Sequence, residues 1–219
     1  MRAAALMLAD ARTPTGSYAH SGGLEAAIAD GLTVADVPAF LHGRLRTVAF
    51  AEAALTAAAT RAAGAADLIA LLAADDEALA RTPSPRLRAA STAVGRGLLR
   101  TAAELWPAAT LTATYRVASE ATPRPVALGV AATAGGLDPR EAALVALHDD
   151  AATLASAAVK LLPVDAAAAL AWVSAAAPEL EALADAAAVP RDLSDLPSGA
   201  APLIDLRALR DDPWRLFAT

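Results

Sequence analysis

The chain has 219 residues, of which 56% are hydrophobic, and it carries a formal net charge of −6. A chain of this length can bury one substantial core, and the absence of any basic block argues against nucleic acid as a partner. It contains no cysteine and only three histidines, which excludes disulfides and thiolate metal sites and makes a self-contained metal cage improbable.

Alanine supplies most of the apolar excess, and alanine is the best helix former. No apolar run approaches the ~18 residues that would indicate a membrane span. The apolar start of the chain ends at Asp10 and Arg12 without a cleavage pattern, so it does not indicate a secretory signal. We therefore expect a soluble, cytoplasmic protein that does not associate with membranes.

The stretch from Asp10 to Glu25 departs from this alanine-rich pattern, because it is rich in glycine, serine and threonine and contains a tyrosine and a histidine. Pro14 followed by Thr15-Gly16 predicts a turn. Ser21 is then a candidate N-cap for a short helix that ends at Gly31. The segment would thus place His20 and Ser21 at a helix N-terminus, with Glu25 one turn further on.

Helices are predicted next over residues 38–63, ending at Gly64, and over 67–81. Their apolar residues recur at spacings of three and four, as in helices that bury one face. Ser84 and Pro85 are the N-cap and first-turn residues expected for another helix, which should end near Trp106. Glu52 falls on the apolar seam of its helix, so we expect it at the edge of the core or in an ion pair.

Shorter helices are predicted over 109–121 and 125–134. Asp138, followed by Pro139 and by Glu141 three positions later, has the pattern of a capping box, and the helix that it begins should run to Pro163. Its narrow apolar seam should lie deep in the bundle or against another chain. His148-Asp149-Asp150 is best interpreted as solvated helix surface, because adjacent helical residues point to different sides.

Asp165 should cap a helix that ends near Ala177, and Pro178 should begin or kink the next one, to about Ala188. The composition then changes: residues 190–202 are rich in Pro, Ser, Asp and Gly, as in a flexible linker. The sequence thus predicts an all-α, single-domain helical bundle of about ten helices over 1–188. Residues 189–219 form the linker and a mobile C-terminal tail.

Four segments of the chain resemble the urease accessory protein F (UreF) family. The first is the N-terminal polar stretch, the second an Arg-Thr-Pro-Ser run with further Arg, Ser and Gly residues at helical spacing, the third a Ser-Ala-Ala-x-Lys-Leu-x-Pro run, and the fourth an Arg-Leu-Phe ending. The residues that match are Asp10, Pro14, Thr15, Gly16, His20, Ser21, Gly23, Leu24 and Glu25; Arg81, Thr82, Pro83, Ser84, Arg88, Ser91 and Gly95; Ser156 to Pro163; and Arg215 to Phe217. Thr13 departs from the pattern, where the family has a bulky apolar residue.

The resemblance implies a non-enzymatic urease accessory protein, a homodimeric scaffold or chaperone for metallocentre assembly. Its implied partners are a UreD-like accessory protein (also called UreH), a UreG-like GTPase and the urease apoprotein. Nickel and GTP would then act through the complex. No phosphate-binding Gly-rich loop occurs in the chain, so we expect no cofactor bound by the chain itself.

The candidate functional residues are charged, polar, apolar or aromatic residues of the matched segments. Lys160 is the only lysine of the chain, which suggests that a compact ammonium is required there. We predict that Glu25 and Lys160 lie within reach of each other or of a shared partner, because a partly buried charge needs compensation. The candidate partner-binding residues are His20, Ser21, Glu25, Lys160, Trp214, Arg215, Leu216 and Phe217. We predict no catalytic residue and no metal ligand.

The tail from Leu203 to Thr219 is predicted to dock on a partner, since Trp214, Leu216 and Phe217 are costly to leave in water. The alternative is that the tail folds back on its own bundle. Two other functions stay open: a helical adaptor unrelated to urease, which co-purification without urease would favour, and a small-molecule enzyme with a site near Glu25 and Lys160, which tight metabolite binding would favour.

Overall fold

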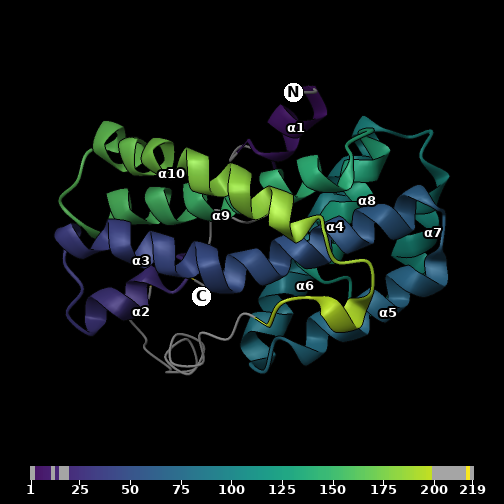
Figure 1. The fold of residues 1–219 in the computed structure, drawn as a ribbon, viewed down its shortest axis with the longest axis horizontal. Helices are drawn as coiled ribbons and strands as arrows, with labels where there is room; N and C mark the ends of the chain where they lie inside the picture. The colour runs from purple at the N-terminus through teal and green to yellow at the C-terminus, as the bar shows by residue number, and fades with distance from the viewer. Residues whose placement is uncertain (1–2, 11–12, 15–19, 199–215, 218–219) are drawn as a thin grey trace.

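The computed structural model describes residues 3–10, 13–14, 20–198 and 216–217. These residues form an all-α fold without any strand in the described ranges (Figure 1), as the sequence predicts. Helix α10 (Ala166–Ala187) packs on α9 (Pro139–Leu161), α9 and α8 (Arg124–Ala134) pack on α4 (Phe50–Gly64), and α6 (Pro85–Leu105) packs on α8. The bundle is thus layered around α4.

The helices follow the predicted order closely. Ser84, Asp138 and Asp165 each occupy an N-cap and accept a backbone N–H bond through their side chains, as expected from the sequence. Asp67, predicted as the first residue of its helix, also proves to be an N-cap of this kind. The bounds are α1 (Ala3–Leu8), α2 (Leu24–Ala29), η2 (Val34–Asp36), α3 (Val37–Arg44), η3 (Leu45–Ala49), α4 (Phe50–Gly64), α5 (Leu68–Ala80), α6 (Pro85–Leu105), α7 (Thr110–Ala118), α8 (Arg124–Ala134), α9 (Pro139–Leu161), α10 (Ala166–Ala187) and η4 (Leu193–Asp195).

The rod that was predicted as one helix over 38–63 contains a π-helical segment, η3, between α3 and α4. A π-helical turn places one additional residue in a helix without ending it. The prediction of a long helix ending at Gly64 therefore holds, but its register changes between Arg44 and Phe50.

Two predicted boundaries were wrong. Pro178 lies inside the continuous helix α10 rather than at the start of a new helix, because the packing of α10 along α9 and α4 maintains the helix despite the missing N–H. Helix α7 ends at Ala118, and Ser119 instead binds the N–H of Thr122 in the turn that follows.

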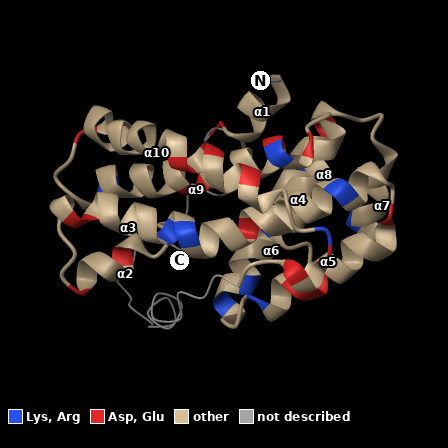
Figure 2. Ribbon diagram, viewed as in Figure 1, with Lys and Arg blue, Asp and Glu red and all other residues tan. Residues whose placement is uncertain are grey.

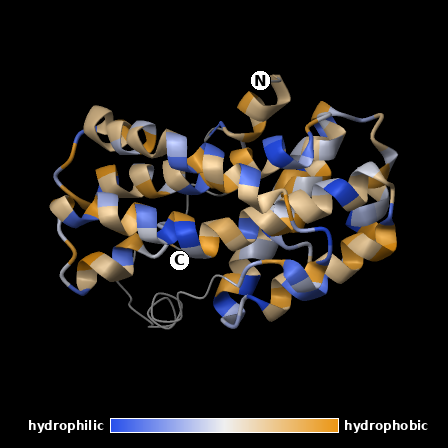
Figure 3. Ribbon diagram, viewed as in Figure 1, coloured by the Kyte–Doolittle hydropathy of each residue, from blue (hydrophilic) through white to orange (hydrophobic). Residues whose placement is uncertain are grey.

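The core is built largely from alanine and leucine, and Figure 3 shows apolar residues running along α4, α8 and α9. Leu147, Ala151, Leu154 and Ala158 of the narrow α9 seam are fully buried within this chain. Of the described helices, α9 alone has the length and hydropathy to cross a membrane, but 56% of its apolar window is buried inside the fold. We interpret α9 as the core helix of the bundle.

The beginning of the predicted linker packs against the bundle. Arg81 donates hydrogen bonds to the carbonyl groups of Leu193 and Pro197 (3.4 and 3.1 Å) and to the Ser198 hydroxyl (3.1 Å). Leu196 is buried. This part of the segment, up to Ser198, therefore differs from the flexible linker expected from composition, because Arg81 supplies donors for its backbone.

Candidate functional site

Arg124 is the centre of a buried charge network. It is the first residue of α8, and its Nη1 and Nη2 each lie 2.6 Å from a carboxylate oxygen, of Glu52 on α4 and Asp149 on α9 respectively. Its side chain is 14% exposed. The ion pair predicted as one possibility for Glu52 is confirmed, and its partner is Arg124.

A second pair stands beside it. The guanidinium of Arg44 binds both carboxylate oxygens of Asp150, with Nε at 2.8 Å and Nη2 at 2.7 Å, and its Nη1 donates to the Gly22 carbonyl at 3.0 Å. This bidentate geometry is the stronger kind of arginine–carboxylate ion pair. It joins the N-terminal polar stretch to α3 and α9.

Both arginines stay charged despite their burial. Burial by itself disfavours a charged guanidinium, but Asp150 beside Arg44 outweighs it, so the pKa of Arg44 lies above its ordinary value. The pKa of Arg124 is raised in the same way, with Glu52 and Asp149 outweighing the desolvation.

In the view of Figure 2, acidic and basic residues are interspersed along the helices rather than gathered in one basic face.

The second matched segment positions Arg124. Ser91 on α6 accepts the backbone N–H of Arg124 at 2.9 Å. Gly95, one turn later, lies so close to the preceding turn that an added Cβ would be 2.1 Å from the Thr122 carbonyl oxygen. Thr122 itself has φ of +46°, an uncommon backbone conformation for a β-branched residue. The Ser and Gly at helical spacing thus hold the turn from which Arg124 enters the network.

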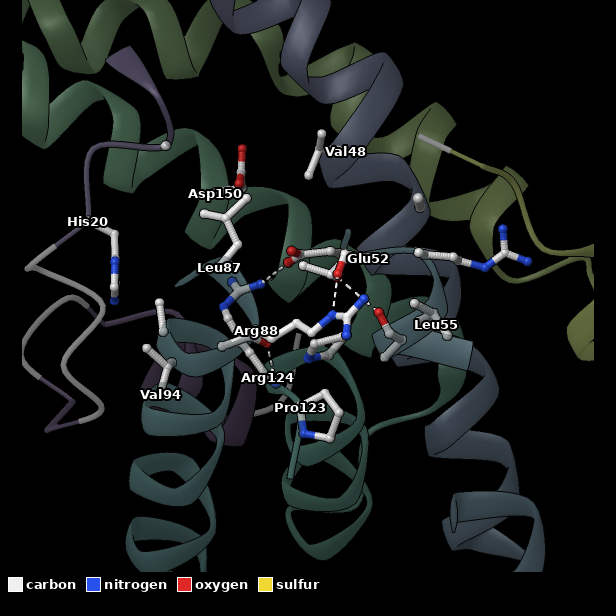
Figure 4. A pocket seen from close by; sticks show the side chains of 18 of the residues that line it. His20, Val48, Glu52, Leu55, Leu87, Arg88, Val94, Pro123, Arg124 and Asp150 are labelled. Carbon is white, nitrogen blue, oxygen red and sulfur yellow. Dashed lines mark hydrogen bonds and ion pairs between the residues drawn. The ribbon is translucent and has the colours of Figure 1, made fainter. Parts of the chain in front are cut away.

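A cavity of about 170 Å³ opens between the N-terminal stretch, α4, α6 and the start of α8. Figure 4 shows Arg88 and Arg124 in the space between His20 on one side and Leu55 on the other. The pKa of His20 lies below its ordinary value because of burial and, secondarily, the nearby Arg124 charge. The charged residues that line the cavity are Arg44, Arg81, Arg88, Arg124, Glu52, Asp149 and Asp150.

The other candidate residues form a separate cluster. The carboxylate of Glu25 accepts the backbone N–H groups of Leu216 (2.6 Å) and Phe217 (3.2 Å). The Lys160 ammonium lies 5.2 Å from the centroid of the Phe217 ring, within the range of a cation–π contact. Glu25 and Lys160 therefore share a partner, as predicted, and that partner is the end of their own chain.

The structure distributes the predicted residues unevenly. His20 lines the cavity, whereas Glu25, Lys160, Leu216 and Phe217 form the cluster around the tail. The exposed position of Lys160 differs from the partly buried charge inferred from the sequence. Trp214 and Arg215, like Tyr18, lie outside the described residues. Docking of the tail on another protein stays a prediction; at Leu216 and Phe217 the contact is with the chain's own bundle.

Ser21 is not the N-cap of α2. Gly23 takes that position with φ of 84°, a left-handed conformation suited to glycine. The buried hydroxyl of Ser21 instead accepts the N–H of Glu25 at 3.4 Å, in the first turn of the helix. Ser21 therefore still contacts the backbone of Glu25, although the N-cap lies two residues later than predicted.

The interpretation of Asp149 and Asp150 as solvated surface was wrong. Their side chains are only 18% and 9% exposed, since each binds a buried arginine. The partners Arg44 and Arg124 lie on other helices, 106 and 25 positions away in the sequence, so the motif alone did not reveal the pairs. The neighbouring His148 has a buried Nδ1 without a hydrogen-bond partner among the described residues. No group of three potential metal ligands occurs in the described ranges.

A further buried carboxylate holds α5 to α7. Asp75 accepts hydrogen bonds from the Tyr115 hydroxyl (2.5 Å) and the Ser119 hydroxyl (2.6 Å). Burial raises the pKa of Asp75, and the two hydroxyl donors only partly offset this. Because Ser119 also binds Thr122, this group supports the same turn that precedes Arg124.

Comparison with known proteins shows relatives along almost the whole chain. The sequence model of the UreF family matches residues 32–189. A urease accessory protein UreF of Mycolicibacterium vanbaalenii is 42% identical over 210 residues, which cover 94% of this chain and 92% of the relative. Proteins of the same name from Mycobacterium sp. strain JLS and Mycobacterium tuberculosis strain H37Ra are 40% and 38% identical, with the same coverage.

Proposed function

The chain belongs to the UreF family of urease accessory proteins, and from this we propose that it is a non-catalytic scaffold for urease maturation. In this proposal it binds a UreD-like (UreH-like) protein and recruits a UreG-like GTPase in the cytoplasm, so that nickel reaches the urease apoprotein upon GTP hydrolysis. In this proposal nickel is the metal that the complex delivers and GTP is the nucleotide that the GTPase hydrolyses, and neither is a cofactor of this chain. The chain also influences the GTPase through this contact.

One observation carries the proposal to particular residues. Glu25, Lys160 and Phe217 come from the first, third and fourth matched segments, which are far apart in the sequence, yet they meet at one place. The cluster combines a carboxylate, an exposed ammonium and an apolar residue at its side, Leu216, which is 64% exposed. Aromatic and charged side chains of this kind are common in protein–protein contacts. We therefore propose this cluster as the partner-binding surface.

Mutation of Lys160 tests the cluster. We expect Lys160→Ala to reduce urease activation in cells while leaving the helical circular dichroism spectrum unchanged, because the side chain is exposed. Arg116→Ala, an exposed cation removed from another helix, is the matched control and should activate normally. Wild-type activation by both Lys160→Ala and Lys160→Arg would show that the lysine is ordinary surface.

The partners are tested by purification of the tagged chain from its source cell. Recovery of UreD-like, UreG-like and urease proteins supports the scaffold. Recovery of other proteins without any of these would favour the adaptor unrelated to urease, and tight binding of a metabolite by the isolated chain would favour the enzyme. Sedimentation of the purified chain tests the proposed homodimer. The apolar seam of α9 gives no support for a dimer, because it is buried inside this chain.

A further inference from the structure

The cavity is lined by two arginines, Arg81 and Arg88, with N–H groups that have no acceptor within the described part of the chain. Nε of Arg81 is buried and lacks a hydrogen-bond partner. Arg88 donates its Nε to the Thr82 carbonyl at 2.5 Å, and this is its only polar contact within the described part of the chain. The two terminal amino groups of Arg88 are therefore uncommitted in a partly buried site.

The carboxylates of the cavity are already in use. Glu52 and Asp149 bind Arg124, and Asp150 binds Arg44. Arg81 has an ion pair with Glu77, which does not line the cavity. Arg88 is thus the cavity cation without a carboxylate among the described residues.

Unmet donors of this kind favour an anionic ligand. The terminal amino groups of Arg88 are not among the buried unpaired atoms, so they remain accessible, and hydrogen bonds from a guanidinium to an ionised acceptor are the stronger kind. The planar guanidinium matches the oxygens of phosphate and carboxylate groups. A cavity of about 170 Å³ exceeds many times the ~10–15 Å³ that one water needs by the same kind of measure, so it has room for such a group with bound water.

We propose that this cavity binds a small oxyanion of the phosphate or carboxylate type, with the terminal amino groups of Arg88 as its principal donors. The site is separate from the Glu25–Lys160–Phe217 cluster and does not depend on the scaffold function. In this site the oxyanion neutralises Arg88 and strengthens the contact between α6 and the start of α8.

Inorganic phosphate is the probe, titrated calorimetrically and by thermal unfolding against chloride at equal ionic strength. We expect saturable binding, with a melting temperature about 3–5 °C higher at ten times the Kd. Acetate at equal ionic strength shows whether the site prefers phosphate or carboxylate. Absence of saturable binding by both anions would overturn the proposal.

Arg88→Gln should abolish this response, whereas Arg100→Gln should keep it. Arg100 lies on the same helix, is exposed and does not line the cavity, so it controls for the loss of one positive charge. An equal response of Arg88→Gln and wild type would refute the assignment. If Arg88→Gln does not fold, Arg88→Lys is the deciding variant, because it keeps the positive charge but loses the planar donor geometry of the guanidinium. A phosphate Kd unchanged from wild type would contradict the role given to the guanidinium.

Discussion

Glu25 holds the backbone of Phe217 through its carboxylate, across almost the entire length of the chain. A hydrogen bond to a charged acceptor contributes roughly 1.5–3 kcal/mol. Phe217 is buried, with 5% of the residue exposed. The end of the chain is thus held by polar and apolar contacts at once.

Glu25→Gln should loosen this contact, because a neutral amide is a weaker acceptor than a carboxylate. We expect the Leu216 and Phe217 amides to exchange with solvent hydrogen at least tenfold faster than in the wild type, while amides of α9 exchange as before. Glu104→Gln, which removes an exposed carboxylate on α6, is the control. Equal protection of the two tail amides in Glu25→Gln and wild type would show that the carboxylate does not hold them.

Arg124→Met should destabilise the fold by about 3–5 kcal/mol, because it leaves the Glu52 and Asp149 carboxylates without their common cation. Urea unfolding followed by circular dichroism measures this. Arg140→Met removes an arginine that also binds two carboxylates, but at the surface, and should cost less than about 1 kcal/mol. Similar losses in both variants would mean that burial of the Arg124 network is unimportant.

Gly95→Ala should destabilise the protein by about 1–3 kcal/mol, since the new methyl group would overlap the Thr122 carbonyl. Gly43→Ala lies in α3, where an added Cβ has nothing within 4 Å, and should stabilise by about 0.5–1 kcal/mol through helix propensity. Chemical denaturation of both variants gives the comparison. A neutral or stabilising effect of Gly95→Ala would contradict the close approach of α6 to the turn.

Asp75 should make the stability depend on pH. Its pKa is higher in the folded than in the unfolded protein, so its contribution is fully present below the unfolded pKa and is lost as pH rises through the folded value. Tyr115 and Ser119 donate hydrogen bonds to it, and the charge of the adjacent Asp76 raises its pKa further. The free energy of unfolding of the wild type, minus that of Asp75→Asn, should therefore decrease from about pH 4 upward. A difference independent of pH would show that Asp75 does not titrate abnormally.

The helices were predictable because their signals are local. Asp138 and Glu141 lie three positions apart and form the capping box that this spacing predicts. The Arg44–Asp150 pair joins residues 106 positions apart, and nothing near either residue indicates the other. The cavity and its charges therefore could not be derived from spacing, although the matched residues Arg88, Ser91 and Gly95 did point to the correct part of α6.

The π-helical segment η3 has a consequence for chain length within the family. Arg44 and Glu52 both line the cavity, eight residues apart. At about 100° per residue a regular α-helix would separate them by about 80°, but one extra residue absorbed in the π turn reduces this to about 20°. Deleting one residue between Leu45 and Ala49 would restore a regular helix and keep both side chains on the same face. We expect this to be the position at which homologous chains tolerate a one-residue insertion or deletion.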